Sequence, residues 1–93
     1  MPDKKWDVRL KRCISKIVFP LSVRASLISL IREIEIEGPI RGNWPNYSKL
    51  NGNRHHCHLK NGKPTYVAVW EVIDKKIKIV EVTYAGTREN APY

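Results

Sequence analysis

The residues best suited to chemistry in this chain are its three histidines, which all lie in the segment Arg54-His55-His56-Cys57-His58. Histidine has an unperturbed pKa that lets it give or take a proton near pH 7. The segment lies within residues 38–70, which contain no aspartate or glutamate. The basic residues of this window are Arg41, Lys49, Arg54, Lys60 and Lys63. A histidine cluster in wholly basic surroundings indicates acid–base chemistry on an anionic substrate.

Length and charge limit the class of protein. The chain has 93 residues, which predicts a single domain over residues 1–93. Hydrophobic residues make up 42% of it, a share that argues against intrinsic disorder. Its 17 lysines and arginines against 9 acidic residues give a net charge of +8. Such a charge on a small body attracts polyanions: RNA, DNA, an anionic membrane surface or an acidic protein.

Targeting signals and cysteine usage indicate a compartment. No apolar run approaches the ~20 residues that a transmembrane helix needs, so we expect no membrane association. The first six residues lack the apolar core of a signal peptide. Cys13 and Cys57 do not make a disulfide framework. These features predict a reduced, cytoplasmic setting.

The apolar pattern of the N-terminal half predicts one strand and two helices. Residues 6–10 alternate between apolar and charged side chains, the period of a half-buried strand. Apolar residues at helical spacing follow in residues 14–18. A longer apolar stripe with a 3.6-residue period then predicts a helix that begins after Ser22, as N-cap, and ends at Gly38-Pro39.

The C-terminal half predicts a three-stranded antiparallel meander after a loop over residues 42–52. Its strands are expected at residues 54–60, 66–73 and 77–84. Asn61-Gly62 is a strong signal for a hairpin turn. The blurred alternation of the last strand indicates a bulge or a strong twist. Residues 86–93 form a short tail. The expected fold is therefore α+β: an N-terminal strand, two helices and the meander, with the helices packed on one face of the sheet.

Strand alternation divides the histidine segment between two faces. Arg54, His56 and His58 share one face, which we expect to be open. The other face carries His55, Cys57 and Leu59. Because Cys57 is small and Leu59 is apolar, this second face is expected to meet the helices.

Three interpretations of the open face are consistent with the residues. It is an exposed basic surface; or His56 and His58 bind zinc; or the face binds a phosphodiester and performs acid–base chemistry. A zinc site needs at least a third ligand and would sit among cations, which disfavours a divalent ion. The third interpretation needs a fixed cation near the phosphate, and the tail offers Arg88 and Tyr93.

The order of these segments resembles the RelE/ParE toxin superfamily of bacterial toxin–antitoxin systems. The likeness covers nearly the whole chain, although each motif is short and degenerate. The segments that carry it are Gly38-Pro39, Trp44-Pro45-Asn46-Tyr47-Ser48-Lys49-Leu50, and residues 54–60, 66–74 and 86–93.

Resemblance to the RelE branch implies a metal-independent endoribonuclease without cofactors. Such proteins cleave mRNA, commonly in the ribosomal A site, by attack of the ribose 2′-OH on the adjacent phosphate, and so inhibit translation. The catalytic positions implied here are His56, His58, Arg88 and Tyr93. The RNA-binding positions expected beside them are Arg54, Lys60, Lys49 and Lys63.

The chain departs from the family pattern in one place. Many members carry an arginine at the start of the second meander strand, where this chain has Tyr66-Val67. Arg54 is expected to supply that charge from the neighbouring strand.

The resemblance also implies partners and leaves alternatives. A cognate antitoxin protein with an acidic or amphipathic segment is expected to cover the basic surface, and mRNA with the ribosome is the expected target. One alternative is a ParE-like toxin that inhibits DNA gyrase without catalysis. Another is a basic nucleic-acid-binding module.

Overall fold

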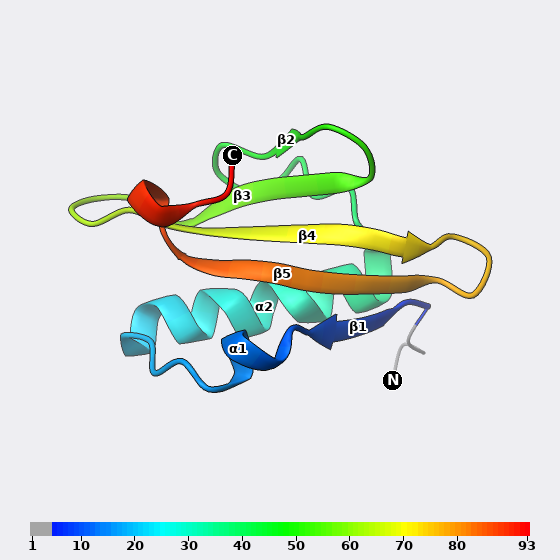
Figure 1. Cartoon of the computed structure of the whole chain (residues 1–93), viewed down its shortest axis with the longest axis horizontal. Helices are drawn as coiled ribbons and strands as arrows, with labels where there is room; N and C mark the ends of the chain where they lie inside the picture. The colour runs from blue at the N-terminus through cyan, green and yellow to red at the C-terminus, as the bar shows by residue number, and fades with distance from the viewer. Residues whose placement is uncertain (1–4) are drawn as a thin grey trace.

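A computed structural model describes residues 5–93 of the chain (Figure 1). The expectation that the chain lacks a signal peptide concerns its first six residues. Of these, residues 1–4 lie outside the described residues. The elements in chain order are β1 (Asp7–Leu10), α1 (Arg12–Ser15), α2 (Leu21–Glu37), β2 (Ser48–Lys49), β3 (Arg54–Lys60), β4 (Tyr66–Asp74), β5 (Ile79–Thr87) and the 3₁₀ turn η1 (Arg88–Asn90).

The expected fold class is wrong. The strands form one five-stranded mixed sheet in the order β1-β5-β4-β3-β2. β3, β4 and β5 pair antiparallel, but β1 joins the edge of β5 in parallel and β2 extends the sheet beyond β3. One long helix and one short helix accompany this sheet. Alternation along residues 6–10 identifies a half-buried strand, but it does not say which strand is its partner.

α2 covers one face of the sheet (Figure 1). Its buried side chains are Val23, Leu27, Leu30 and Ile34, the stripe that the sequence indicates. The predicted N-cap at Ser22 is wrong, because Pro20 occupies the N-cap position and makes no side-chain cap hydrogen bond. The predicted end is confirmed at Gly38, which has φ 98°. A Cβ there would also lie 3.2 Å from Nε1 of Trp6, so glycine satisfies both the backbone and the space.

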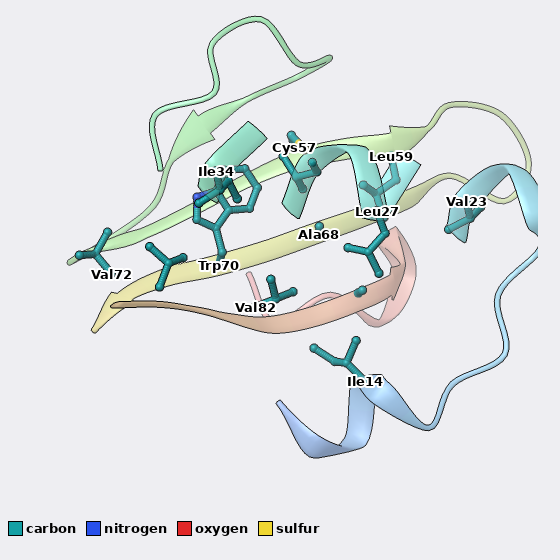
Figure 2. Close-up of a cluster of buried hydrophobic side chains, with 13 residues drawn as sticks. Ile14, Val23, Leu27, Ile34, Cys57, Leu59, Ala68, Trp70, Val72 and Val82 are labelled. Atoms are coloured by element: carbon teal, nitrogen blue, oxygen red, sulfur yellow. The ribbon is translucent and has the colours of Figure 1, made fainter. Parts of the chain in front are cut away.

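The hydrophobic core lies between the helices and this face of the sheet (Figure 2). Trp70 is fully buried at its centre, and its indole Nε1 donates a hydrogen bond of 2.9 Å to the Pro39 carbonyl. Cys57 and Leu59 of β3 belong to the same core, which confirms that their side of the strand meets the helices. Burying the indole N–H with a partner avoids the cost of an unsatisfied donor.

Several boundaries differ from those expected. The predicted loop over residues 42–52 contains the edge strand β2. By contrast, the link between β3 and β4 runs over residues 61–65, as the predicted strand limits require. β5 continues to Thr87, past the predicted end at residue 84. The expected bulge is confirmed by register shifts in the β4–β5 pair, between Val69 and Trp70 and between Val72 and Asp74.

Within residues 5–93, none of the helices has the length and apolar character that crossing a bilayer requires.

Gly86 and Tyr84 pack closely at the end of β5, just before Arg88, and a substitution can test this packing. A Cβ on Gly86 would lie 2.8 Å from the Tyr84 hydroxyl, which donates a 2.6 Å hydrogen bond to the Thr87 carbonyl. Because Tyr84 must move, we expect Gly86→Ala to lower the free energy of unfolding by about 1–3 kcal/mol in urea titration.

Gly42→Ala is the matched control, because nothing lies within 4 Å of a Cβ there. It should change the free energy by less than about 0.5 kcal/mol. In a Tyr84→Ala background the cost of Gly86→Ala should disappear. Equal effects of the two alanine substitutions would contradict this account of Gly86.

Candidate active site

The candidate site lies on the face of the sheet opposite to α2. Strand register places His56 opposite Val69, and Val69 opposite Tyr84. In the next row, His58 lies opposite Val67. Both valines are fully buried, although their side chains lie on the face away from the core. They form an apolar floor beside the two histidines.

Tyr93 joins this face from the far end of the sequence. The chain turns at η1 and runs back towards β2 and β3 (Figure 1). The ring centroids of Tyr93 and His56 are 4.5 Å apart, and those of His56 and His58 are 6.4 Å apart. His56 is only 9% exposed and His58 only 7%. The expectation of an open face is therefore wrong, since the histidines are largely covered. We call the site formed by His56, His58 and Tyr93 the recess.

Hydrogen bonds at Nδ1 orient both histidines. His56 Nδ1 lies 3.0 Å from the Ser48 hydroxyl and 3.3 Å from the Ser48 carbonyl oxygen. His58 Nδ1 contacts Oδ1 of Asn61. A carbonyl or amide oxygen can only accept, so each Nδ1 donates its proton to this partner. Both rings thus present Nε2 away from these partners.

The sequence does not identify Ser48 or Asn61 as a site residue. It indicates Asn61 only as a turn residue and Ser48 only as part of a loop. The offset of three residues between His58 and Asn61 is compatible with a contact across a strand end. No comparable signal identifies Ser48, because its pairing with His56 depends on the unexpected strand β2.

The loop before β2 is held by hydrogen bonds at both ends. Glu33 of α2 accepts hydrogen bonds from Arg41 at 3.1 Å and from Asn43 at 2.8 Å. Further along, the His58 backbone N–H donates to the Pro45 carbonyl at 2.8 Å. These contacts bring the loop to the edge of β3, where Ser48 can reach His56.

Burial and charge set the protonation of the recess. Burial lowers the pKa of His56, and the hydrogen bond to the Ser48 backbone opposes this effect. Repulsion from His58 and, less strongly, from Arg88 acts in the same direction as burial. Partial burial raises the pKa of the Tyr93 phenol, against the effect of Arg88. Near neutral pH, His56 is therefore neutral and Tyr93 keeps its proton. One group can take a proton and the other can give one.

Arg88 and Lys63 share a surface depression of about 600 Å³, whose lining does not include His56, His58 or Tyr93. Thr65 and Thr87 contribute hydroxyl-bearing side chains to its lining, and Glu89 contributes a carboxylate. Guanidinium, ammonium and hydroxyl groups are the common protein partners of phosphate oxygens. Of the expected RNA-binding positions, Lys63 is thus brought together with Arg88.

The other expected RNA-binding positions lie elsewhere. Arg54 is on the histidine face, but its cross-strand neighbour is the carboxylate of Glu71. Lys49 lies opposite His55, so its side chain belongs to the helix side of the sheet. Lys60 is exposed at the end of β3, opposite Tyr66.

His55 has a structural environment on the helix side. Its ring stacks on Trp70 with centroids 5.8 Å apart and an interplanar angle of 8°. Its Nδ1 lies 2.7 Å from the Tyr47 hydroxyl. The expectation that His55 faces away from His56 and His58 is confirmed.

A shared metal site has little support from this geometry. Residues 5–93 contain no group of three or more histidine, cysteine or carboxylate side chains placed to hold one ion. Burial raises the pKa of the Cys57 thiol to about 12, which keeps the sulfur protonated. Cys57 is a core residue and not a ligand.

The two lowered histidine pKa values predict a pH-dependent stability. Burial lowers the pKa of both His55 and His56 below 6.5. The unfolded chain therefore binds protons on these residues at a higher pH than the folded chain does. Their contribution to stability is complete above pH 6.5 and is lost as the pH falls through the folded values.

Urea unfolding at constant ionic strength should show a free energy that falls between pH 7 and pH 5. His55→Gln removes one titrating group, so its curve should be less steep over this interval. A free energy that stays constant or rises as the pH falls would contradict the assignment of these histidines as neutral.

Comparison of the chain with models of protein families, with curated proteins and with solved structures found no match in any of the three.

Proposed function

We propose that this protein is a metal-independent endoribonuclease that cleaves mRNA by attack of the ribose 2′-OH on the adjacent phosphate. One observation carries the proposal: the ring centroids of His56 and Tyr93 lie 4.5 Å apart. These are the positions that the likeness to the RelE branch implies, and they come from opposite ends of the C-terminal half.

His56 acts as the general base. Its neutral form is favoured by burial, and its Nδ1–H is engaged by Ser48, so the lone pair on Nε2 can accept the 2′-OH proton. The 2′ oxygen then bonds to phosphorus while the bond from phosphorus to the 5′ oxygen breaks. His58 or Tyr93 donates a proton to that leaving oxygen. The products are a 2′,3′-cyclic phosphate and a 5′-hydroxyl end.

Arg88 holds the phosphate. Charge accumulates on the non-bridging oxygens in the transition state, and a fixed guanidinium stabilises it more than it stabilises the ground state. Lys63, on the wall that it shares with Arg88, binds the neighbouring part of the RNA backbone. The net charge of +8 supports a polyanionic substrate.

In this proposal the protein is the toxin of a toxin–antitoxin pair, and it acts on mRNA in association with the ribosome. Its partner is a protein with an acidic segment that covers the recess and neutralises the basic surface. Charge complementarity of this kind favours fast association.

A synthetic RNA incubated with the purified protein and EDTA tests the chemistry, in parallel reactions with and without ribosomes. Mass spectrometry should find cyclic phosphate ends, and a single 2′-deoxy nucleotide at the cleaved position should block the cut. We expect His56→Gln to lower kcat by about 10²–10⁴-fold. Arg88→Ala should lower it by about 10²–10³-fold.

Arg32→Ala is the matched control for charge, because Arg32 is an exposed residue of α2 on the opposite side of the sheet. It should cleave like the wild type. The proposal fails if the His56 and Arg88 variants, with circular dichroism unchanged, cut RNA at the wild-type rate. Growth arrest with intact mRNA and stalled supercoiling would indicate the gyrase-directed alternative instead.

Asn61 should act as a positioning residue for His58, since its side-chain oxygen contacts Nδ1. We expect Asn61→Ala to lower kcat about tenfold with little change in KM, because the ring loses its fixed orientation. Asn61→Asp keeps the acceptor and adds a charge that favours imidazolium. It should restore kcat and move the pH–rate profile to higher pH.

Asn51→Ala serves as the control, as it changes an exposed asparagine in the loop before β3. A purely structural role for Asn61 would lower stability in both Asn61 variants and leave the pH–rate profile where it is in the wild type.

A further inference from the structure

A second depression lies on the helix side of the sheet, separate from the recess. It has a volume of about 360 Å³, within the range of about 300–1,000 Å³ that small-molecule sites occupy. Its lining includes Trp6, Glu37, Lys49, Asn53, His55 and Lys75. We call it the Trp6 pocket. None of the chemistry proposed above uses it.

The walls of the Trp6 pocket are fixed by the fold. The backbone N–H groups of Lys5 and Trp6 donate to the Glu35 carbonyl at 2.8 and 2.9 Å, which holds the indole beside the end of α2. Gly38 allows the indole to approach its backbone. On another side, His55 is held by its stack on Trp70. Little reorganisation is needed before a ligand binds.

His55 is a polar member of the lining of this pocket. Its Nδ1 lies 2.7 Å from the Tyr47 hydroxyl. Among residues 5–93, Nδ1 is the ring nitrogen of His55 with a hydrogen-bond partner, and Nε2 is left for a ligand.

The remaining groups separate into two kinds. Lys49, on β2, and Lys75, in the turn after β4, contribute basic residues to the lining. Glu37 and the C-terminal end of α2 place acceptors near Trp6. A simple anion would meet the carboxylate and the negative end of the helix. A ligand with a phosphate at one end and a flat ring bearing N–H donors at the other can bind both kinds of group. Its phosphate pairs with the lysines, and its N–H donors pair with the acceptors.

We propose that the Trp6 pocket binds a nucleotide. The base lies against the indole of Trp6 with its N–H groups towards Glu37, and the phosphate is held by Lys49 and Lys75. Aromatic side chains bind bases by stacking in a manner that tolerates sequence. Nε2 of His55 forms a hydrogen bond with the ligand.

The nucleotide can be free or part of an RNA strand, and β2 relates the two possibilities. Ser48 faces His56, while the next residue, Lys49, faces His55. A strand that passes around this edge of the sheet would therefore meet the recess on one face and the Trp6 pocket on the other. Of the two possibilities, only binding of an RNA strand rests on the proposed nuclease function.

Titration of the full chain with the four ribonucleoside 5′-monophosphates tests the pocket without any cleavage reaction. In ¹H–¹⁵N spectra, the backbone signals of Trp6, Asn53, His55 and Lys75 should shift in a saturable way. Trp6→Leu and Lys75→Ala should each weaken binding by about 5-fold to 100-fold. Lys76→Ala is the matched control in the same turn, since Lys76 is not part of the lining, and should bind like the wild type.

Three results would overturn the proposal. One is the absence of saturable shifts at millimolar nucleotide. Another is equal weakening by Lys75→Ala and Lys76→Ala, which would mean diffuse charge attraction. The third is binding that Arg88→Ala abolishes and Lys49→Ala leaves intact, which would place the nucleotide in the recess.

A non-cleavable 2′-deoxy-substituted oligonucleotide distinguishes the two sources. If it shifts the signals of the Trp6 pocket and the recess together, the ligand is the RNA strand. If mononucleotides shift the pocket signals and the oligonucleotide shifts only those of the recess, the ligand is a free nucleotide. Either pattern supports the proposal that the Trp6 pocket binds a nucleotide. Loss of cleavage in a recess variant does not contradict either source of that nucleotide.

Discussion

Burial of one side of β3 against α2 is the constraint from which the arrangement of the site follows. Cys57 and Leu59 are part of the core, so the alternate residues of the strand must lie on the opposite face. A slip of one residue would place His56 among the core side chains and expel Cys57 from them. The apolar stripe of α2 thus decides which histidines share the recess with Tyr93.

The sequence predicts the local elements better than it predicts their assembly. The apolar stripe of α2, its end at Gly38 and the existence of β3, β4 and β5 are all visible in residue periodicity. The parallel pairing of β1 with β5 is not, because alternation along residues 6–10 carries no information about a partner more than seventy residues away. β2 is too short to have a period of its own.

The sequence likewise predicts one part of the candidate site and not the rest. The division of the histidine segment between two faces follows from strand alternation and is confirmed. That Tyr93 would reach His56 depends on the path of the chain after β5, which a single turn at η1 determines. The separation of Lys49 from the histidine face depends on β2, so sequence alone could not remove Lys49 from the expected RNA-binding set.

The pairing of β1 with β5 has a consequence for how the molecule is made. Folding during synthesis proceeds from the N-terminus, but β1 has no partner until residues 79–82 have emerged. By then α2, β3 and β4 have already been synthesised, but the apolar stripe of α2 cannot pack on the complete sheet until β5 has emerged. Such non-local pairing slows folding and prolongs the exposure of apolar surface. The nascent chain is therefore expected to need protection from aggregation, and the recess is among the last features to form.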